Sequence, residues 1–134
     1  MNYVTLVKHA KAARKNSHSP YSRFRVGAAL LTSDNTLFTG CNIEISTYAL
    51  TLCAERTAIF KARSDGFKNF KAIAIATDES EYIPPCGACR QVLMDLAGDI
   101  DIILSNKTRK PQVMKLSSLL PMAFGPRNLR HPKR

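Results

Sequence analysis

Hydrophobic and polar residues along the first third of the chain predict one helix and a strand hairpin. Over residues 2–15 the apolar side chains recur at the spacing of one helical face. Residues 17–22, which include a proline, break that pattern and are typical of a loop. The apolar run over residues 25–32 predicts a buried strand, and the turn residues 33–35 lead into a returning strand over residues 36–39.

The rest of the pattern alternates helices with short strands. It predicts six further elements: helices over 51–63 and 86–96, strands over 71–76, 100–104 and 112–116, and a helical turn over 117–120. We see no repeat, linker or domain boundary, and we expect a single domain over residues 1–134. Interleaved helices and strands favour helices on both faces of a sheet, and the early hairpin rules out a purely parallel one. The sequence therefore predicts an α/β fold, a three-layer α/β/α sandwich with a five-stranded mixed sheet.

The composition supports a globular protein without a membrane-spanning segment. Hydrophobic residues make up 45% of the 134 residues and charged residues 22%, which is unlike a disordered chain. A chain of this length can bury an adequate core without disulfides. Met1 leads into an amphipathic, lysine-bearing stretch that does not resemble a signal peptide, and we therefore expect a cytoplasmic protein.

The chain is strongly basic, with 20 Lys and Arg against 10 Asp and Glu and a formal net charge of +10. Basic residues concentrate over residues 8–15 and 107–110 and in a basic tail at about 127–134. A surplus of this kind can attract RNA or other polyanions. Because the charges are otherwise scattered, we favour a solvated helix face, loop and tail over a nucleic-acid surface.

The cysteines carry the first chemical signal. Cys86 and Cys89 form a C-x-x-C pair, which on its own fits a zinc site, a redox dithiol or chance. Cys53, at the start of another predicted helix, adds a third thiolate. Three ligands leave the fourth corner of a zinc tetrahedron open to water, as in catalytic zinc sites. Neither Cys41 nor any of the three histidines has ligand-like spacing to complete a closed structural site.

The residues after Cys53 add groups that a catalytic zinc site can use. Both ligand groups fall at predicted helix N-termini, which favour thiolate over thiol. Zn²⁺ with three thiolates carries a net charge of −1, and Arg56, within one helical turn, could donate hydrogen bonds to sulfur and withdraw that charge. Glu55 can project beside the metal without ligating it and move protons for a bound water. A first-turn glutamate that only complements the helix dipole is the alternative interpretation.

Four motifs in this order resemble the zinc-dependent nucleoside deaminases, and specifically the small cytidine deaminases. They are Cys53-Ala54-Glu55 with Pro85-Cys86-Gly87-Ala88-Cys89, the strand Phe24 to Leu30, Asn42-Ile43-Glu44, and Leu119 to Phe124. The resemblance implies one zinc per chain on Cys53, Cys86 and Cys89. It also implies attack of a zinc-bound hydroxide on C4 of cytosine, with Glu55 carrying protons from the water to ring N3 and the departing amine.

The resemblance also implies a set of substrate contacts. Backbone groups of Ala54 and Pro84 would bind the edge of the base, while Phe24 would pack on the base or sugar, unless it only packs in the core. Asn42 and Glu44 would hydrogen-bond the 3′ hydroxyl of the sugar. The 5′ side of the sugar would neighbour the segment that ends at Tyr48, which reads Ile-Ser-Thr-Tyr where many relatives have Asn-Ala-Ser-Tyr.

By the same resemblance, the protein would be a homotetramer in pyrimidine salvage, converting cytidine or deoxycytidine to uridine or deoxyuridine. Phe124 would reach the substrate of a neighbouring subunit, unless it caps its own core. A cytosine nucleoside analogue such as blasticidin S is the nearest alternative substrate. The alternatives of another class are a zinc module without activity and an RNA-binding basic protein. Glu44 favours a free nucleoside, because a carboxylate there would repel a 3′ phosphate.

Overall fold

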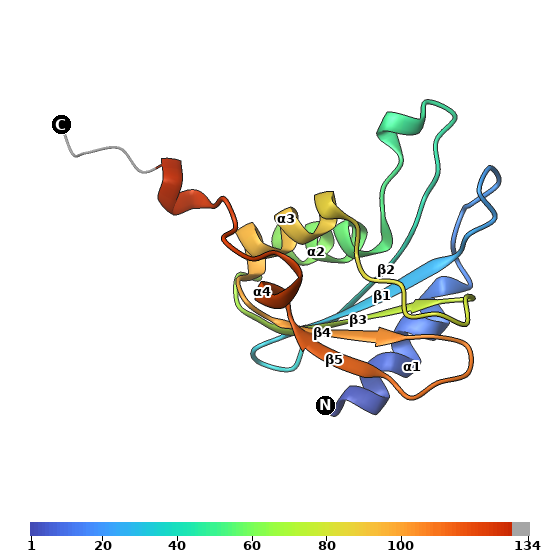
Figure 1. The fold of residues 1–134 in the computed structure, drawn as a ribbon, viewed down its shortest axis with the longest axis horizontal. Coiled ribbons are helices and arrows are strands. Elements are labelled where there is room, and N and C mark those ends of the chain that lie inside the picture. Colours follow the sequence, from blue (N-terminus) through green and yellow to red (C-terminus); the bar gives the residue numbers. More distant parts are fainter. Residues whose placement is uncertain (130–134) are drawn as a thin grey trace.

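The computed structural model describes residues 1–129, in which a five-stranded sheet forms the middle layer (Figure 1). The last residues of the predicted basic tail, 130–134, lie outside this range. The strands are β1 (Val26–Thr32), β2 (Leu37–Cys41), β3 (Phe70–Thr77), β4 (Asp101–Ser105) and β5 (Gln112–Lys115), arranged in the order β2-β1-β3-β4-β5. Only β3 and β4 pair in parallel, and the other neighbours are antiparallel, which confirms the predicted mixed sheet.

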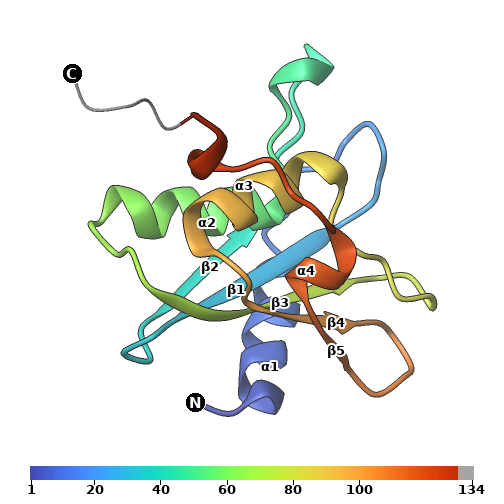
Figure 2. The same cartoon turned by 60° about the vertical axis from the view of Figure 1, so that its left-hand side comes forward.

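Helices cover both faces of the sheet, as Figure 2 shows from a second direction. Helix α1 (Tyr3–Arg14) packs on one face, and α2 (Ala54–Ser64), α3 (Gly87–Ala97) and the short α4 (Leu116–Leu119) pack on the other. Successive strand residues point to opposite faces: Ile102 and Leu104 join the core under α2 and α3, whereas Ile103 joins the core under α1. The three-layer α/β/α sandwich predicted from the sequence is therefore confirmed.

The helix predicted over residues 51–63 begins later than expected, at Ala54. Leu52 is held in extended conformation by two backbone hydrogen bonds with Ile43, of 2.9 and 3.0 Å, which keeps the chain out of the helix up to Cys53. Two short 3-10 turns, Tyr48–Leu50 and Pro126–Leu129, were not predicted. The delayed start matters because it makes Cys53 the residue that caps α2.

Close backbone contact fixes α2 against the sheet. At Gly40 in β2, a Cβ atom would lie 2.5 Å from the carbonyl oxygen of Ala54 and 2.7 Å from the amide nitrogen of Ala58. Only glycine permits this approach without moving backbone. The first turn of α2 is thereby held at a defined height above the sheet. Across residues 1–129, the helices are too short or too polar for any of them to cross a membrane.

Candidate functional site

Two helices begin at cysteines on the same side of the sheet. Cys53 is the N-cap of α2 and Cys86 the N-cap of α3, and neither side chain forms a capping hydrogen bond. Cys89 follows in the first turn of α3 and is fully buried. The free backbone N–H groups at both helix ends favour negative charge, so this position stabilises thiolates.

The three sulfur atoms have the spacing of a metal site. The Sγ atoms of Cys53, Cys86 and Cys89 all lie within 4.8 Å of one another, and those of Cys53 and Cys86 are 3.8 Å apart. A tetrahedral zinc with Zn–S bonds of about 2.3 Å needs sulfur atoms separated by about 3.8 Å. The donor set therefore fits zinc with three thiolates. Cys41 is not part of the group and is a half-buried thiol at the end of β2, where burial raises its pKa.

Protons are shared unevenly among the sulfur atoms. The pKa of Cys53 is lowered to about 5, first by a hydrogen bond from Cys89 and then by one from Arg56, against the opposing effect of burial. The pKa of Cys89 is raised, because its proton is held in that bond to Cys53 and because the thiol is buried. Between Cys53 and Cys89, Cys53 is therefore the sulfur that ionises first.

Arg56 lies where the sequence predicted it, beside the sulfur of Cys53. One guanidinium nitrogen, Nη2, is 3.5 Å from Cys53 Sγ and 3.5 Å from the carbonyl oxygen of Thr51. Hydrogen bonding to Cys53 raises the pKa of Arg56, so the guanidinium stays charged. This single cation partly offsets the negative charge of the sulfur cluster.

Glu55 is a buried carboxylate next to the sulfur cluster. Its side chain is only 4% exposed, and burial raises its pKa to about 7, with a further contribution from the nearby charge of Cys53. A carboxyl with a pKa near neutrality can both accept and release a proton at physiological pH. Its environment therefore suits proton transfer better than permanent charge.

A cavity of about 190 Å³, which we call the inner cavity, opens between the helix N-termini and the sheet. It brings together seven of the residues singled out by the sequence: Phe24, Asn42, Cys53, Ala54, Glu55, Pro84 and Cys86. The remaining walls are largely apolar and come from β1, β3 and the segment before α3: Val26, Ile75, Thr77 and Ile83, together with Thr51. A flat, mostly apolar ring could enter here and meet the sulfur cluster and Glu55 at one end.

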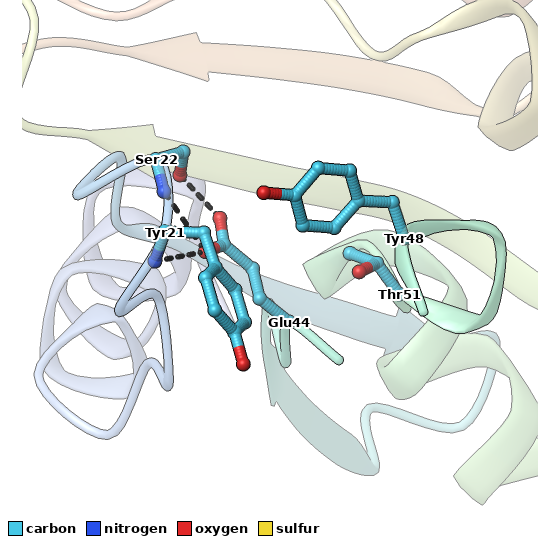
Figure 3. Close-up of a pocket in the computed structure, with 5 residues that line it drawn as sticks. All are labelled: Tyr21, Ser22, Glu44, Tyr48 and Thr51. Carbon is cyan, nitrogen blue, oxygen red and sulfur yellow. Dashed lines mark hydrogen bonds between the residues drawn. The ribbon is translucent and has the colours of Figure 1, made fainter. Parts of the chain in front are cut away.

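A more open depression of about 370 Å³, the outer pocket, shares Thr51 with the inner cavity. Glu44 and Tyr48, both predicted, line it with Tyr21 and Ser22 (Figure 3). The rings of Tyr21 and Tyr48 lie 5.6 Å apart between centroids, and their residues are 51% and 71% exposed. The outer pocket is therefore open to solvent on its aromatic side.

Asn42 and Glu44 each hold the loop that leads into β1. The Asn42 Nδ2 donates to the carbonyl oxygen of Phe24 at 2.7 Å, and its Oδ1 accepts from the Val26 amide at 2.9 Å. The Glu44 carboxylate accepts from the backbone amides of Tyr21 and Ser22, each at 3.0 Å, and from the Ser22 hydroxyl. These bonds place Phe24 at the wall of the inner cavity.

Phe124 lies in a separate depression with Phe60, Val92 and Leu96, away from the walls of the inner cavity. Its side chain is 57% exposed, and Met122, two residues earlier, is 99% exposed. Phe124 therefore does not line the inner cavity of its own chain. Its carbonyl oxygen accepts from Gln91 Nε2 at 2.7 Å, which ties the segment to α3.

Sequence reasoning missed the residues that complete the pocket through long-range contacts. Tyr21 and Ser22 belong to a loop that the sequence marked only by its turn composition, and Thr51 was assigned to a helix. The pairing of Ser22 with Glu44 joins positions 22 residues apart and has no local signature. Within that loop, the turn-forming residues, including the proline, were the only signal, and they indicated a loop without its partner.

Comparison with known proteins gives one consistent family. The family model described as the cytidine and deoxycytidylate deaminase zinc-binding region matches residues 2–104. A cytidine deaminase of Sporosarcina psychrophila is 45% identical over 130 residues, covering 96% of each chain, and one of Halalkalibacterium halodurans is 48% identical over 125 residues, covering 92% of this chain and 95% of the relative. The crystal structure of cytidine deaminase from Burkholderia pseudomallei superposes with a TM-score of 0.89 at 44% identity, covering 92% of this chain and 100% of that one.

Proposed function

The chain belongs to the zinc-dependent cytidine and deoxycytidylate deaminase family, and we propose that it hydrolyses cytidine and deoxycytidine to uridine and deoxyuridine, releasing ammonia. One observation carries this assignment: Glu55, buried and with a pKa near 7, lies beside three sulfur atoms spaced for zinc, in a cavity open to a small ring. A structural zinc site has no use for such a carboxylate. The cofactor is zinc, one ion per chain.

We assign the zinc ligands to Cys53, Cys86 and Cys89, because their sulfur atoms match the tetrahedral spacing. When bound, zinc lowers the pKa of a water molecule and so supplies a nucleophile at neutral pH. Arg56 stabilises the thiolate of Cys53 through the 3.5 Å contact and limits the negative charge that three sulfurs place on the metal. The N-termini of α2 and α3 act in the same direction.

Glu55 is the proposed acid and base. It accepts one proton from the attacking water as the new C4–O bond forms and delivers it to ring N3. It then accepts the second proton from the new C4 hydroxyl and delivers it to the amine as the C4–N bond breaks and the C4 carbonyl forms. One carboxyl can do this in sequence only if its pKa lies near the working pH, which burial provides here. Water plus cytidine thus becomes uridine plus ammonia with Glu55 returned to its starting state.

The base and the sugar are assigned to the two parts of the pocket. In the inner cavity, the backbone groups of Ala54 and Pro84 bind the polar edge of the base and Phe24 packs against the ring or sugar. Asn42 borders the inner cavity and Glu44 the outer pocket, and these positions support assigning both side chains to the 3′ hydroxyl. Tyr48 lines the outer pocket on the side left open to solvent, where the 5′ end of the sugar would face.

We further propose a homotetramer that completes this open side. Tyr48, Met122 and Phe124 are large apolar residues exposed to solvent, and a neighbouring subunit would cover them. Since Phe124 does not reach the cavity of its own chain, we assign its ring to the substrate of a neighbouring subunit. We also retain three expectations from the sequence: a single domain over residues 1–134, a cytoplasmic location and a role in pyrimidine salvage.

The direct test is to incubate the purified zinc protein with cytidine and follow the ultraviolet change to uridine, with release of ammonia measured in parallel. We expect turnover of cytidine and deoxycytidine and almost none of 3′-CMP or single-stranded RNA. Preferred conversion of cytosine within RNA would replace the nucleoside assignment. No turnover by a fully zinc-loaded protein would favour a zinc module without activity.

The ligand assignment has its own control in the fourth cysteine. Cys86→Ala and Cys89→Ala each remove a ligand and should lose zinc by elemental analysis, with lowered folding stability. Cys41→Ala changes a thiol outside the cluster and should keep one zinc per chain. Full zinc retention in both ligand variants would contradict the assignment.

A further inference from the structure

Two loops far apart in sequence lie side by side at one edge of the sheet (Figure 1). Because β3 and β4 are parallel neighbours, the loops that follow them leave the sheet at the same edge. We call these the catalytic-side loop, residues 78–86, which leads into α3, and the 106–110 loop, which links β4 to β5. The first loop carries Pro84 and Cys86 into the inner cavity.

Hydrogen bonds join the two loops along their length. Asn106 Nδ2 donates to the carbonyl oxygen of Ser80 at 3.0 Å, and the Lys107 amide donates to the carbonyl oxygen of Glu79 at 3.1 Å. Further along, the Tyr82 hydroxyl donates to the carbonyl oxygen of Lys110. Three hydrogen bonds therefore hold the 106–110 loop against the catalytic-side loop.

Asn106 is the centre of this contact. It is 1% exposed, and its Oδ1 accepts from the amides of Thr108 at 3.1 Å and Arg109 at 2.7 Å. One side chain thus closes the turn of its own loop with its oxygen and holds the other loop with its nitrogen. A buried amide with both ends engaged has little freedom to move.

The two loops carry side chains of opposite charge. The catalytic-side loop carries Asp78, Glu79 and Glu81, whereas the 106–110 loop carries Lys107, Arg109 and Lys110. The guanidinium carbon of Arg109 lies 5.9 Å from the ring centroid of Tyr82. One of the three basic concentrations in the chain therefore belongs to a loop that is hydrogen-bonded to an acidic segment of the same molecule.

The link reaches the active site through a stiff segment. Two residues separate Tyr82 from Pro85, and the Pro84-Pro85 pair has backbone φ angles fixed by the pyrrolidine rings. On the other side, Arg90 Nε donates to the carbonyl oxygen of Pro85 at 2.7 Å. A segment fixed at both ends transmits a shift at Ser80 or Tyr82 to Pro84 and Cys86 instead of absorbing it.

We propose that Asn106 is a positioning residue for the deaminase site, and that its bond to Ser80 sets where the Pro84 backbone and the Cys86 sulfur lie. The proposal rests on the proposed function for the role of Pro84, but its effect on Cys86 can be measured without turnover. Asn106 touches neither substrate nor metal and acts only through the catalytic-side loop.

The test is Asn106→Asp in the zinc-loaded protein. Aspartate keeps the oxygen that accepts from Thr108 and Arg109 but replaces the donor to Ser80 with a second acceptor. Supporting contacts of metal ligands change affinity about 10- to 100-fold, so zinc should transfer to a chromogenic chelator at least about tenfold faster. Misplacement of Pro84 should lower kcat/KM for cytidine by about 10- to 100-fold, mainly through kcat.

Thr108→Ala is the matched control, because it changes a side chain in the same turn and keeps the backbone amide that Asn106 binds. It should leave zinc transfer and kcat within about twofold of the parent. Substituting Co²⁺ for zinc adds a spectroscopic reading, since a displaced Cys86 changes the thiolate-to-cobalt absorption of Asn106→Asp. A variant that is only less stable would keep the parent's zinc transfer rate, kcat and cobalt spectrum at temperatures below those at which it unfolds.

Parent-like zinc transfer, cobalt spectrum and kcat in Asn106→Asp would overturn the proposal. If Asn106→Asp does not fold, Asn106→Ser decides, because a serine hydroxyl can still accept from the amides of its own turn but is too short to reach the Ser80 carbonyl. Faster zinc transfer in that variant supports the proposal, and an unchanged rate overturns it. A zinc protein that never deaminates cytidine would refute the proposed function. The rate of zinc transfer to the chelator would still test whether Asn106 positions Cys86.

Discussion

Glu55 in the inner cavity and Glu44 at the outer pocket are both shielded from solvent, with exposed fractions of 4% and 8%. Their pKa values nevertheless move in opposite directions. Burial raises that of Glu55 to about 7, whereas hydrogen bonds from the Ser22 hydroxyl and amide, and then from Tyr21, lower that of Glu44. Glu55 lies among sulfur atoms and apolar walls, and Glu44 lies against two backbone amides and a hydroxyl.

The difference teaches that depth of burial and the supply of hydrogen bonds together decide what a shielded carboxylate can do. A carboxylate held by several donors stays ionised and serves as a fixed anion that orients a ligand. A carboxylate with few donors exchanges protons near neutral pH and serves as an acid or base. The two regions also differ in closure, since the inner cavity is walled and the outer pocket is open beside Tyr48.

The largest expected effect is at the inner cavity. Glu55→Gln keeps the shape of the side chain but cannot carry a proton, so kcat for cytidine should fall by about 10³- to 10⁴-fold. Zinc content and the thermal unfolding midpoint should stay close to those of the parent, as measured by elemental analysis and calorimetry. A variant that works within about tenfold of the parent would make Glu55 a helix-dipole residue and end the proposed mechanism.

The same substitution at the outer pocket should act on binding instead of proton transfer. Glu44→Gln keeps an acceptor for the loop amides but loses the negative charge, and we expect a rise in KM for cytidine of about 10- to 100-fold with a smaller change in kcat. Because the like charge is gone, discrimination against 3′-CMP should weaken. A loss of kcat as severe as that of Glu55→Gln would erase the distinction between the two carboxylates.

A smaller effect should follow from opening the solvent-exposed side further. Phe124→Ala should raise KM for cytidine by about tenfold while zinc content is unchanged, because the ring is proposed to reach a neighbouring copy. Light scattering of the parent should give the mass of four chains. Phe60→Ala, in the same depression, is the control for simple packing damage. A fully active monomer would exclude a shared site.

The smallest effect is on stability and has opposite signs for the two carboxylates. The lowered pKa of Glu44 means that its contribution to stability is present above pH 4.5 and is lost as the pH falls through its folded-state pKa. The raised pKa of Glu55 means that its contribution is present below pH 4.5 and is lost as the pH rises through about 7.

Thermal unfolding of the zinc-free protein tests this contrast. Glu44→Gln should be less stable than the parent at pH 6 and approach it at pH 3, whereas Glu55→Gln should gain on the parent between pH 5 and 8. The same sign of pH dependence for both variants would refute the contrast. The cysteines titrate in the variant and in the parent alike, so comparing the two at the same pH removes their contribution to the difference in stability. Only the part of the cysteine titration that depends on the charge of Glu55 remains.

The sequence predicted the elements and the chemical centre because both depend on local patterns. Strand and helix periodicity located all five strands and the three long helices, and the spacing of Cys86 and Cys89 marked the metal site. The start of α2 could not be predicted, because Leu52 is held extended by Ile43, a contact between distant segments. The helical spacing of apolar residues carries no information about extended pairing with a distant segment.

The contacts made by loops could not be predicted from the sequence for the same reason. Residues 107–110 look like a solvated basic loop, and only the parallel pairing of β3 with β4 brings them against the acidic residues after β3. Similarly, Ser22 carries no signal of its contact with Glu44 until the loop folds back on the strand end. Contacts of this kind depend on topology, which the pattern of one segment does not contain.

The two cysteine N-caps have a consequence for the life of the chain in a cell. Most helices begin at a residue whose oxygen binds the first amides, but α2 and α3 begin at sulfurs that make no such bond. A metal that joins the sulfurs supplies the support that a capping oxygen would otherwise give to both first turns. A newly synthesised chain that meets no zinc would expose frayed helix starts to proteases, so zinc supply would set how long each copy survives as well as how many copies are active.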